Sequence, residues 1–139
     1  MKRITVVFGV VATLLVFITY SHAQTNVSGT VNTTTWTAAN SPYRVTGAIT
    51  VPTGEALTIE AGVNVLFDAD VEFIVQGEIH VMGTEEANVR FAKGSAPEWG
   101  GIRISGGQSS SFSYAQISDG SASNGGGIYL ANSGAYVTM

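Results

Sequence analysis

The chain has 139 residues, no cysteine, a formal net charge of −4 and only 12% charged residues. This length suits one domain of ordinary size, and the missing cysteine excludes disulfides as a source of stability. No basic stripe that could neutralise phosphates is present, so nucleic acid is not an expected partner.

Residues 1–23 are predicted to be a secretory signal peptide. Lys2 and Arg3 form a basic start, residues 4–20 form an apolar core, and Ser21-His22-Ala23 is a small-x-small cleavage site. An uncleaved membrane anchor is the alternative, because the apolar run approaches the length of a membrane span. Both interpretations predict an extracellular or cell-surface protein, and no membrane span is expected once the signal is cleaved.

Residues 24–45 are predicted to form an N-terminal cap segment. The segment is rich in Thr and lacks aliphatic alternation, and Trp36 and Tyr43 are its large aromatic side chains. The terminal unit of a repeat protein must cover unpaired strand edges and an open core. Trp36 and Tyr43 are therefore expected to be lids on the core, and a platform on which sugars stack is the alternative.

Residues 63–81 alternate strictly, because every odd-numbered position is apolar or glycine. A period of two is typical of a β-strand, but one straight strand of this length would span on the order of 60 Å. The run must therefore bend while the same side stays inward, and residues 68–70 and 76–77 are the expected corners. A chain that turns corners around a single core is a β-solenoid.

A motif of the form Gly-x-Ile-x-aliphatic recurs four times, beginning at Gly47, Gly77, Gly100 and Gly126. The copies lie 30, 23 and 26 residues apart, which is typical of solenoid repeats. We expect their inward residues to stack along one buried wall, namely Ile49, Val51, Ile79, Val81, Ile102, Ile104, Ile128 and Leu130. The predicted fold is all-β, a parallel β-helix of about four coils over residues 46–139, and an antiparallel β-sandwich is the alternative.

Residues 51–67, VPTGEALTIEAGVNVLF, resemble the opening N-terminal rungs of bacterial secreted right-handed parallel β-helix repeat proteins, which have the pectin-lyase-like fold. These proteins tend to show a progression of Val-Pro-x-Gly, Leu-Thr-Ile-x-x-Gly-Val and Val-x-Phe. Residues 99–102 are similar to their Trp-x-Gly-Ile rung start, and Trp36 with residues 41–43 is similar to their lead-in. Ala61 stands where Pro is frequent. The resemblance implies a fold and leaves the activity open, since the fold serves lyases, glycosidases, adhesins and scaffolds.

The outward positions of the repeated motif are candidates for a ligand-facing column. They are Thr50, His80, Arg103 and Tyr129, and Glu78 lies two residues before His80. Glu78, His80, Arg103 and Tyr129 are the expected ligand-facing residues, because these side chains are common in polysaccharide sites. The alternative is that they are the ordinary polar surface of a sheet.

A second candidate is a calcium site near Asp68, Asp70 and Glu72. These carboxylates alternate along the outward side of the strand run, and a bend at Ala69 would bring them together. A solvated acidic corner is the alternative. No other cofactor is expected, and no Ser/His/Asp set, zinc spacing or phosphate-binding loop can be assembled as a catalytic or cofactor-binding group.

The sequence therefore predicts a secreted or cell-surface β-helix scaffold, similar to an adhesin, that is non-catalytic and binds an extracellular polysaccharide or a surface protein. The alternative is the N-terminal part of a carbohydrate-active polysaccharide lyase or glycoside hydrolase. Residues 136–139 begin a strand-like run with no polar cap after it. We expect either further coils in a longer protein or self-association through this open end.

Overall fold

The computed structural model describes residues 23–106, 109–123, 126–131 and 136–138. The predicted signal peptide lies outside these residues, except for Ala23. In the part of the chain that is described, no helix has the length and apolarity needed to cross a membrane.

The described chain consists of short strands connected by corners of different lengths. They are β1 (Thr25–Thr30), β2 (Thr34–Trp36), β3 (Tyr43–Val51), β4 (Ala56–Glu60), β5 (Asn64–Phe67), β6 (Phe73–Val75), β7 (Glu78–Met82), β8 (Val89–Lys93), β9 (Ile102–Ile104), β10 (Ser109–Ser113), β11 (Ala115–Ile117), β12 (Ile128–Leu130) and β13 (Tyr136–Thr138), with one 3-10 turn, η1 (Ala38–Asn40).

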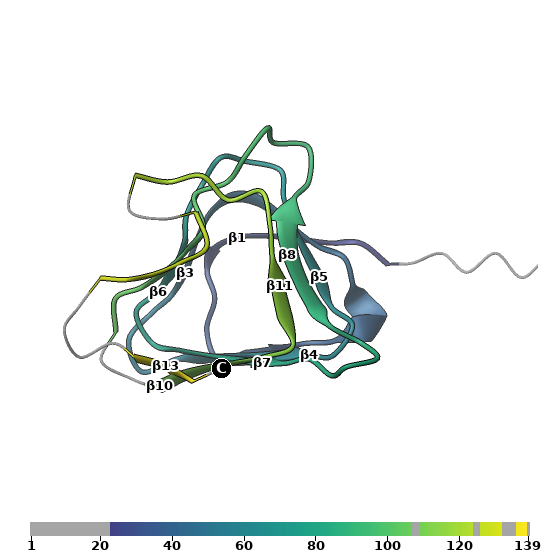
Figure 1. The fold of residues 1–139 in the computed structure, drawn as a ribbon, viewed down its shortest axis with the longest axis horizontal. Helices are drawn as coiled ribbons and strands as arrows, with labels where there is room; N and C mark the ends of the chain where they lie inside the picture. Colours follow the sequence, from purple (N-terminus) through teal and green to yellow (C-terminus); the bar gives the residue numbers. More distant parts are fainter. Residues whose placement is uncertain (1–22, 107–108, 124–125, 132–135, 139) are drawn as a thin grey trace, which may run out of the picture.

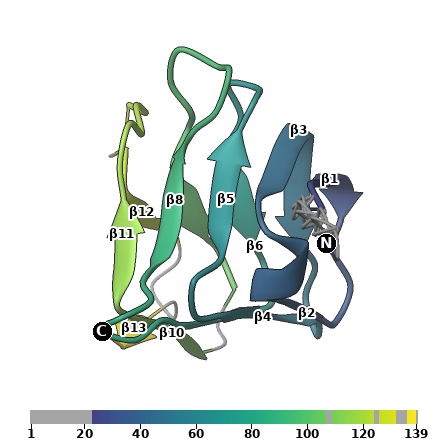
Figure 2. The same ribbon diagram turned by 90° about the vertical axis from the view of Figure 1, so that its right-hand side faces the viewer.

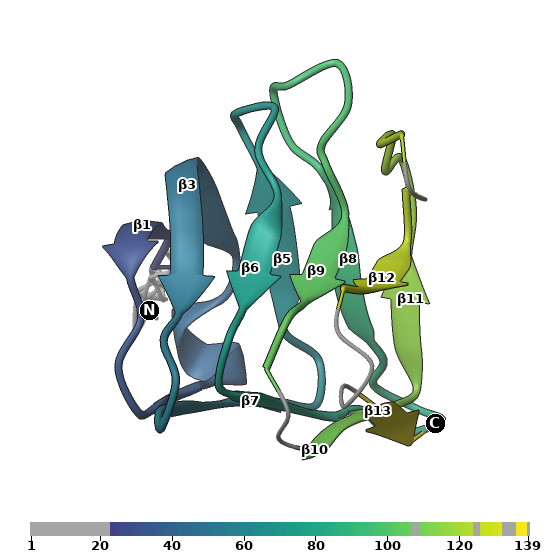
Figure 3. The ribbon, with the colours of Figure 1, turned by 90° about the vertical axis from the view of Figure 1, so that its left-hand side faces the viewer.

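The strands form three flat faces around one core, which gives a triangular outline when the molecule is viewed along its coils (Figure 1). The long strands β1 and β3 bend across two of these faces. One face continues from β3 through β5, β8 and β11 (Figure 2), and another continues from β3 through β6, β9 and β12 (Figure 3). The third face contains β2, β4, β7, β10 and β13, and we call it the base sheet.

All strand pairs in the described residues are parallel. The fold is therefore the predicted parallel β-helix, with about four turns, and the antiparallel β-sandwich is wrong. The alternating run 63–81 bends at residues 68–70 and 76–77, as predicted, and so supplies β5, β6 and β7 to three different faces.

The N-terminal segment, which was predicted to be a cap, takes part in the coil through two strands. Strand β1 pairs with β3, and β2 pairs with β4. Trp36 stacks on Tyr43 with ring centroids 4.6 Å apart, and each side chain is only 4% exposed. Both aromatic residues are thus buried within the core. Because their ring faces pack on each other, they do not form an open platform for sugars.

The predicted single wall of isoleucines is wrong, because the repeated motif does not return to the same face. Ile49 is followed in its ladder by Phe73, Ile102 and Ile128. Ile79 instead pairs with Leu57 on the base sheet. The glycine of the motif marks a corner, and a corner can precede any face.

Most of the predicted inward residues are nevertheless buried, since the parity of a strand is kept around each corner. Ile49, Val51, Ile79, Val81, Ile102 and Ile104 are at most 1% exposed. Leu130 is the exception at 42% exposed, and Ile128 is half-buried. Both lie on β12, which pairs with β9 on one side only in the described chain.

Candidate functional site

The outer face of the base sheet has a column of small polar side chains that crosses four strands. Thr35 pairs with Thr58, Thr58 with His80, and His80 with Ser111. The residues on both sides of Thr58, His80 and Ser111 are buried, as is Trp36 beside Thr35, so these four side chains face outward. We call Thr35, Thr58, His80 and Ser111 the hydroxyl column, in which His80 is the one member without a hydroxyl group.

His80 is held between two partners on this face. Its Nε2 lies 2.9 Å from Oε2 of Glu78, and its Nδ1 lies 3.1 Å from Oγ of Ser111. A carboxylate only accepts, so in the neutral imidazole Nε2–H donates to Glu78 and Nδ1 accepts the hydroxyl hydrogen of Ser111. The side chains of His80 and Glu78 remain 32% and 35% exposed, so this network is fixed in position yet open to solvent.

A shallow hollow of about 300 Å³ lies beside Glu78 and is lined by Gly54, Glu55, Ala56 and Glu78. Oε2 of Glu55 accepts hydrogen bonds from the Thr33 backbone N–H at 2.6 Å and from its hydroxyl at 2.5 Å. The hydrogen bond from the Thr33 hydroxyl, followed by the one from its backbone N–H, holds the pKa of Glu55 below its usual value. Glu55 is therefore ionised at neutral pH, and two of the four residues that line the hollow are acidic.

Among the described residues, Lys and Arg lie only on the other two faces. The four Lys and Arg residues of the described chain are Arg44 on β3, Arg90 and Lys93 on β8, and Arg103 on β9. In contrast, the outward residues of the base-sheet strands include Glu60 and Glu78, with Glu55 at the rim, and no Lys or Arg among those that are described. The base sheet thus has outward carboxylates with no Lys or Arg beside them among the described residues.

The four predicted ligand-facing residues form two separate pairs. Glu78 and His80 lie together on the base sheet, whereas Arg103 and Tyr129 are neighbours on β9 and β12. Ile74 pairs with Thr50 on one side and with Arg103 on the other, which is the position that was predicted for His80. The single column is therefore wrong, while ligand binding by either pair stays a prediction. Ser111 was missed because it lies 31 residues from His80 and meets it only through the coil register.

The predicted calcium corner has other contacts. Both carboxylate oxygens of Asp68 bind Arg44, and Glu72 lies 3.8 Å from the guanidinium of Arg103. Within the described residues, no three His, Cys, Asp or Glu side chains are grouped so that they could hold a metal ion. Calcium binding at Asp68, Asp70 and Glu72 stays a prediction, and the existing contacts of Asp68 and Glu72 do not favour it.

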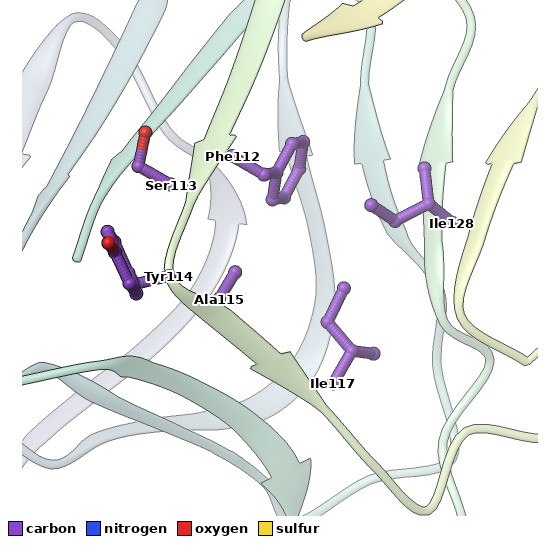
Figure 4. A pocket seen from close by; sticks show the side chains of 6 residues that line it. All are labelled: Phe112, Ser113, Tyr114, Ala115, Ile117 and Ile128. Carbon is purple, nitrogen blue, oxygen red and sulfur yellow. The ribbon is translucent and has the colours of Figure 1, made fainter. Parts of the chain in front are cut away.

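An apolar pocket of about 480 Å³ opens at the last described coil, where Phe112, Ile117 and Ile128 face a common space (Figure 4). Ser113, Tyr114 and Ala115 complete its lining. Phe112 belongs to the same core that fills the earlier coils, and Ile117 and Ile128 pack against that core. Self-association through this end stays a prediction.

Comparisons of the chain with protein-family models, with curated protein sequences and with solved structures found no match. The class of protein is defined by the fold itself, a parallel β-solenoid of about four turns with an acidic, hydroxyl-bearing face. Functional inference therefore depends on the chemistry of that face.

Proposed function

We propose that the protein is an exported β-helix scaffold, similar to an adhesin, that binds an extended polysaccharide on the outer face of its base sheet. The observation that supports this is the hydroxyl column. Neighbouring strands lie about 4.8 Å apart, which is close to the length of one sugar unit in an extended chain. A polysaccharide lying along the coil axis would meet one polar side chain of the column per coil.

The β-solenoid suits this role because it holds its surface groups in place before binding. Each member of the column is on a strand that is hydrogen-bonded to its neighbours in a parallel sheet. Hydroxyl groups both donate and accept, as do those of sugars. Little ordering of the protein is needed on binding, so a series of individually weak hydrogen bonds can add up to measurable affinity.

Binding is a better proposal than catalysis for this face. Ser111, His80 and Glu78 form a hydrogen-bonded chain, as a nucleophile, a base and an orienting acid would. Acyl transfer also needs donors that stabilise a developing oxyanion, and the backbone N–H groups of strands inside a parallel sheet are already used in its ladders. The alternative, a segment of a carbohydrate-active lyase or hydrolase, predicts release of soluble sugar products.

The resemblance to pectin-lyase-like proteins supports a carbohydrate partner, and we propose membership in that group. The proposal also includes export, because residues 1–23 have the composition of a signal peptide. Sequencing the N-terminus of the secreted protein is expected to give Gln24 as the first residue. Retention of Lys2 and Arg3 would favour the membrane-anchor alternative.

The test is co-sedimentation of the purified protein with a panel of insoluble polysaccharides, together with analysis of the supernatant for soluble sugars. We expect binding to at least one polysaccharide and no released product. The double variant Thr58→Val, Ser111→Ala removes two hydroxyls and is expected to weaken binding several-fold. Thr50→Val, a matched change on another face, is expected to have no effect.

Three results would contradict the proposal. If the protein bound no polysaccharide of the panel, the proposal that its partner is a glycan would be wrong. Equal losses from the base-sheet variant and from Thr50→Val would show that the hydroxyl column is not the contact surface. Release of sugar products by the unmodified protein would favour the enzyme alternative.

A further inference from the structure

We infer that the polysaccharide bound by the base sheet bears amino groups, and that its ammonium groups meet Glu78 and Glu55 at the hollow beside the hydroxyl column. This inference rests on the proposed function and adds the chemical class of the ligand. Four features of the same face support it: its charge, its hollow, the fixed position of Glu78 and the spacing of the column.

The charge of the face selects against acidic polymers. Outward residues of β4 and β7 include Glu60 and Glu78, and Glu55 precedes β4. In the described chain every Lys and Arg lies on β3, β8 or β9, so none of them is on the base sheet to pair with a carboxylate of a ligand. A polyuronate lying along this face would meet like charges, whereas a polymer with ammonium groups would meet opposite ones.

The hollow supplies a place for an ammonium group. Ala56 pairs with Glu78 on the neighbouring strand, and both line the hollow. The methyl group of Ala56 leaves room that a larger outward side chain would fill. Glu55 and Glu78 therefore line one concavity that a ligand on this face can reach.

Glu78 is positioned to bind a cation without first reorganising. His80 holds its Oε2 at 2.9 Å, while its Oε1 has no hydrogen-bond partner among the described residues. Glu55 is similarly fixed through one oxygen by Thr33. Each carboxylate thus has one oxygen engaged by the protein and one that remains for an ammonium N–H donor.

The spacing of the face fits a regular amino-sugar polymer. Thr58, His80 and Ser111 lie on successive coils, so they can bind hydroxyl or ring oxygens of successive sugars. Glu78 lies two residues before His80, on the same side of β7, and so flanks the column. A polymer along the column would place its amino substituents toward this flank.

The experiment is calorimetric titration of the purified protein with three hexasaccharides of equal length: glucosamine, N-acetylglucosamine and galacturonate. The titrations are made at a pH below the pKa of the sugar amines. We expect the glucosamine hexamer to bind most tightly, the N-acetylglucosamine hexamer more weakly, and the galacturonate hexamer not at all. Affinity for the glucosamine hexamer is expected to fall as salt is raised, because the charges are exposed.

Two variants and one control variant locate the contact. Glu78→Gln is expected to weaken glucosamine hexamer binding about two- to five-fold, the range of one exposed ion pair. Glu98→Gln removes the same charge from an exposed position between β8 and β9 and is expected to leave affinity unchanged. Ala56→Leu fills the hollow without changing charge and is also expected to weaken binding. Circular dichroism of each variant shows whether the coil is intact.

The outcomes separate the two proposals. Binding of the galacturonate or N-acetylglucosamine hexamer at least as tightly as the glucosamine hexamer would overturn the amino-sugar inference and leave the glycan scaffold standing. Equal effects of Glu78→Gln and Glu98→Gln would overturn the assigned contact. No binding of any hexamer, together with no binding in the polysaccharide panel, would overturn both proposals.

Discussion

Asp68 forms an ion pair between consecutive coils, which we call the Asp68 clamp. Replacing Asp68 should make the free energy of unfolding less dependent on pH in the acid range. Arg44 on β3 donates from Nε to Oδ2 of Asp68 at 2.6 Å and from a second guanidinium nitrogen to Oδ1. Ser95 donates its backbone N–H and its hydroxyl to Oδ1 at 2.8 and 2.7 Å. The hydrogen bonds from Arg44, followed by those from Ser95, lower the pKa of Asp68 from 3.8 to about 2.

The size of the effect follows from this change in pKa. A drop of nearly two units corresponds to about 2.4 kcal/mol of extra stability for the ionised form. The side chains of Arg44 and Asp68 are 24% and 16% exposed, so solvent screens part of the interaction. We therefore expect Asp68→Asn to lower the free energy of unfolding by about 1 to 2 kcal/mol at neutral pH.

The pH dependence has a definite sign. Because the folded-state pKa lies below that of the unfolded chain, the stabilisation is complete above about pH 4 and is lost as pH falls toward about 2. Urea unfolding of the unmodified protein and of Asp68→Asn, followed by circular dichroism across this range, should give curves that converge in acid. Asp70→Asn is the control, since Asp70 is exposed and has no hydrogen-bond or ion-pair partner among the described residues.

A constant difference between the two proteins from pH 7 to about pH 2 would refute this reasoning, because it would show that the ionised carboxylate is not the source of the stability. An equal effect of Asp70→Asn would refute the role of the clamp.

Three further predictions concern the stability of the coil, each measured as the free energy of unfolding in urea. Ile79→Ala should cost about 2 to 5 kcal/mol because the side chain is fully buried, whereas Arg103→Ala should cost far less; similar costs would contradict the burial assignment. Gly77→Ala should destabilise strongly, because a Cβ there would collide with backbone carbonyls of the preceding coil, while Gly127→Ala has open space and should be tolerated. Tyr114 has a φ of +44° at a one-residue corner, so Tyr114→Gly should be more stable than Tyr114→Ala by about 1 kcal/mol; the reverse order would show that the corner is not strained.

The inward and outward sides of the coil could be predicted from the sequence, because alternation is a local property of a strand. In the run 63–81, Val65, Phe67, Phe73 and Val75 are fully buried as their parity predicts. The corner residues Ala69 and Val71 are only half-buried, since the chain there leaves the strand geometry that parity requires. Parity thus predicted the core and the bends without any knowledge of which strands are neighbours.

The coil register could not be predicted in the same way, because corners differ in length. The corner before β7 takes two residues, residues 76–77, whereas residues 94–101 separate β8 from β9. Counting from one glycine motif to the next therefore assigned Ile79 to the ladder of Ile49, where Phe73 lies instead. The same error placed His80 beside Arg103 and concealed Ser111 as its partner.

The outward residues of each face are the ones whose types can reflect function, because packing of the core does not determine them. Packing restricts the inward residues of a solenoid to apolar side chains of suitable size, whereas an outward position accepts almost any polar side chain. On the two faces other than the base sheet, Arg44, Lys93 and Arg103 each approach a carboxylate of a neighbouring coil within 4 Å, so these charges contribute to the contacts between coils. The base sheet has no such cation among its described residues, and its Glu78 is held instead by His80. The base sheet therefore differs from the other two faces in having outward carboxylates without a Lys or Arg beside them among the described residues, and the proposed cationic ligand would supply the missing positive charge.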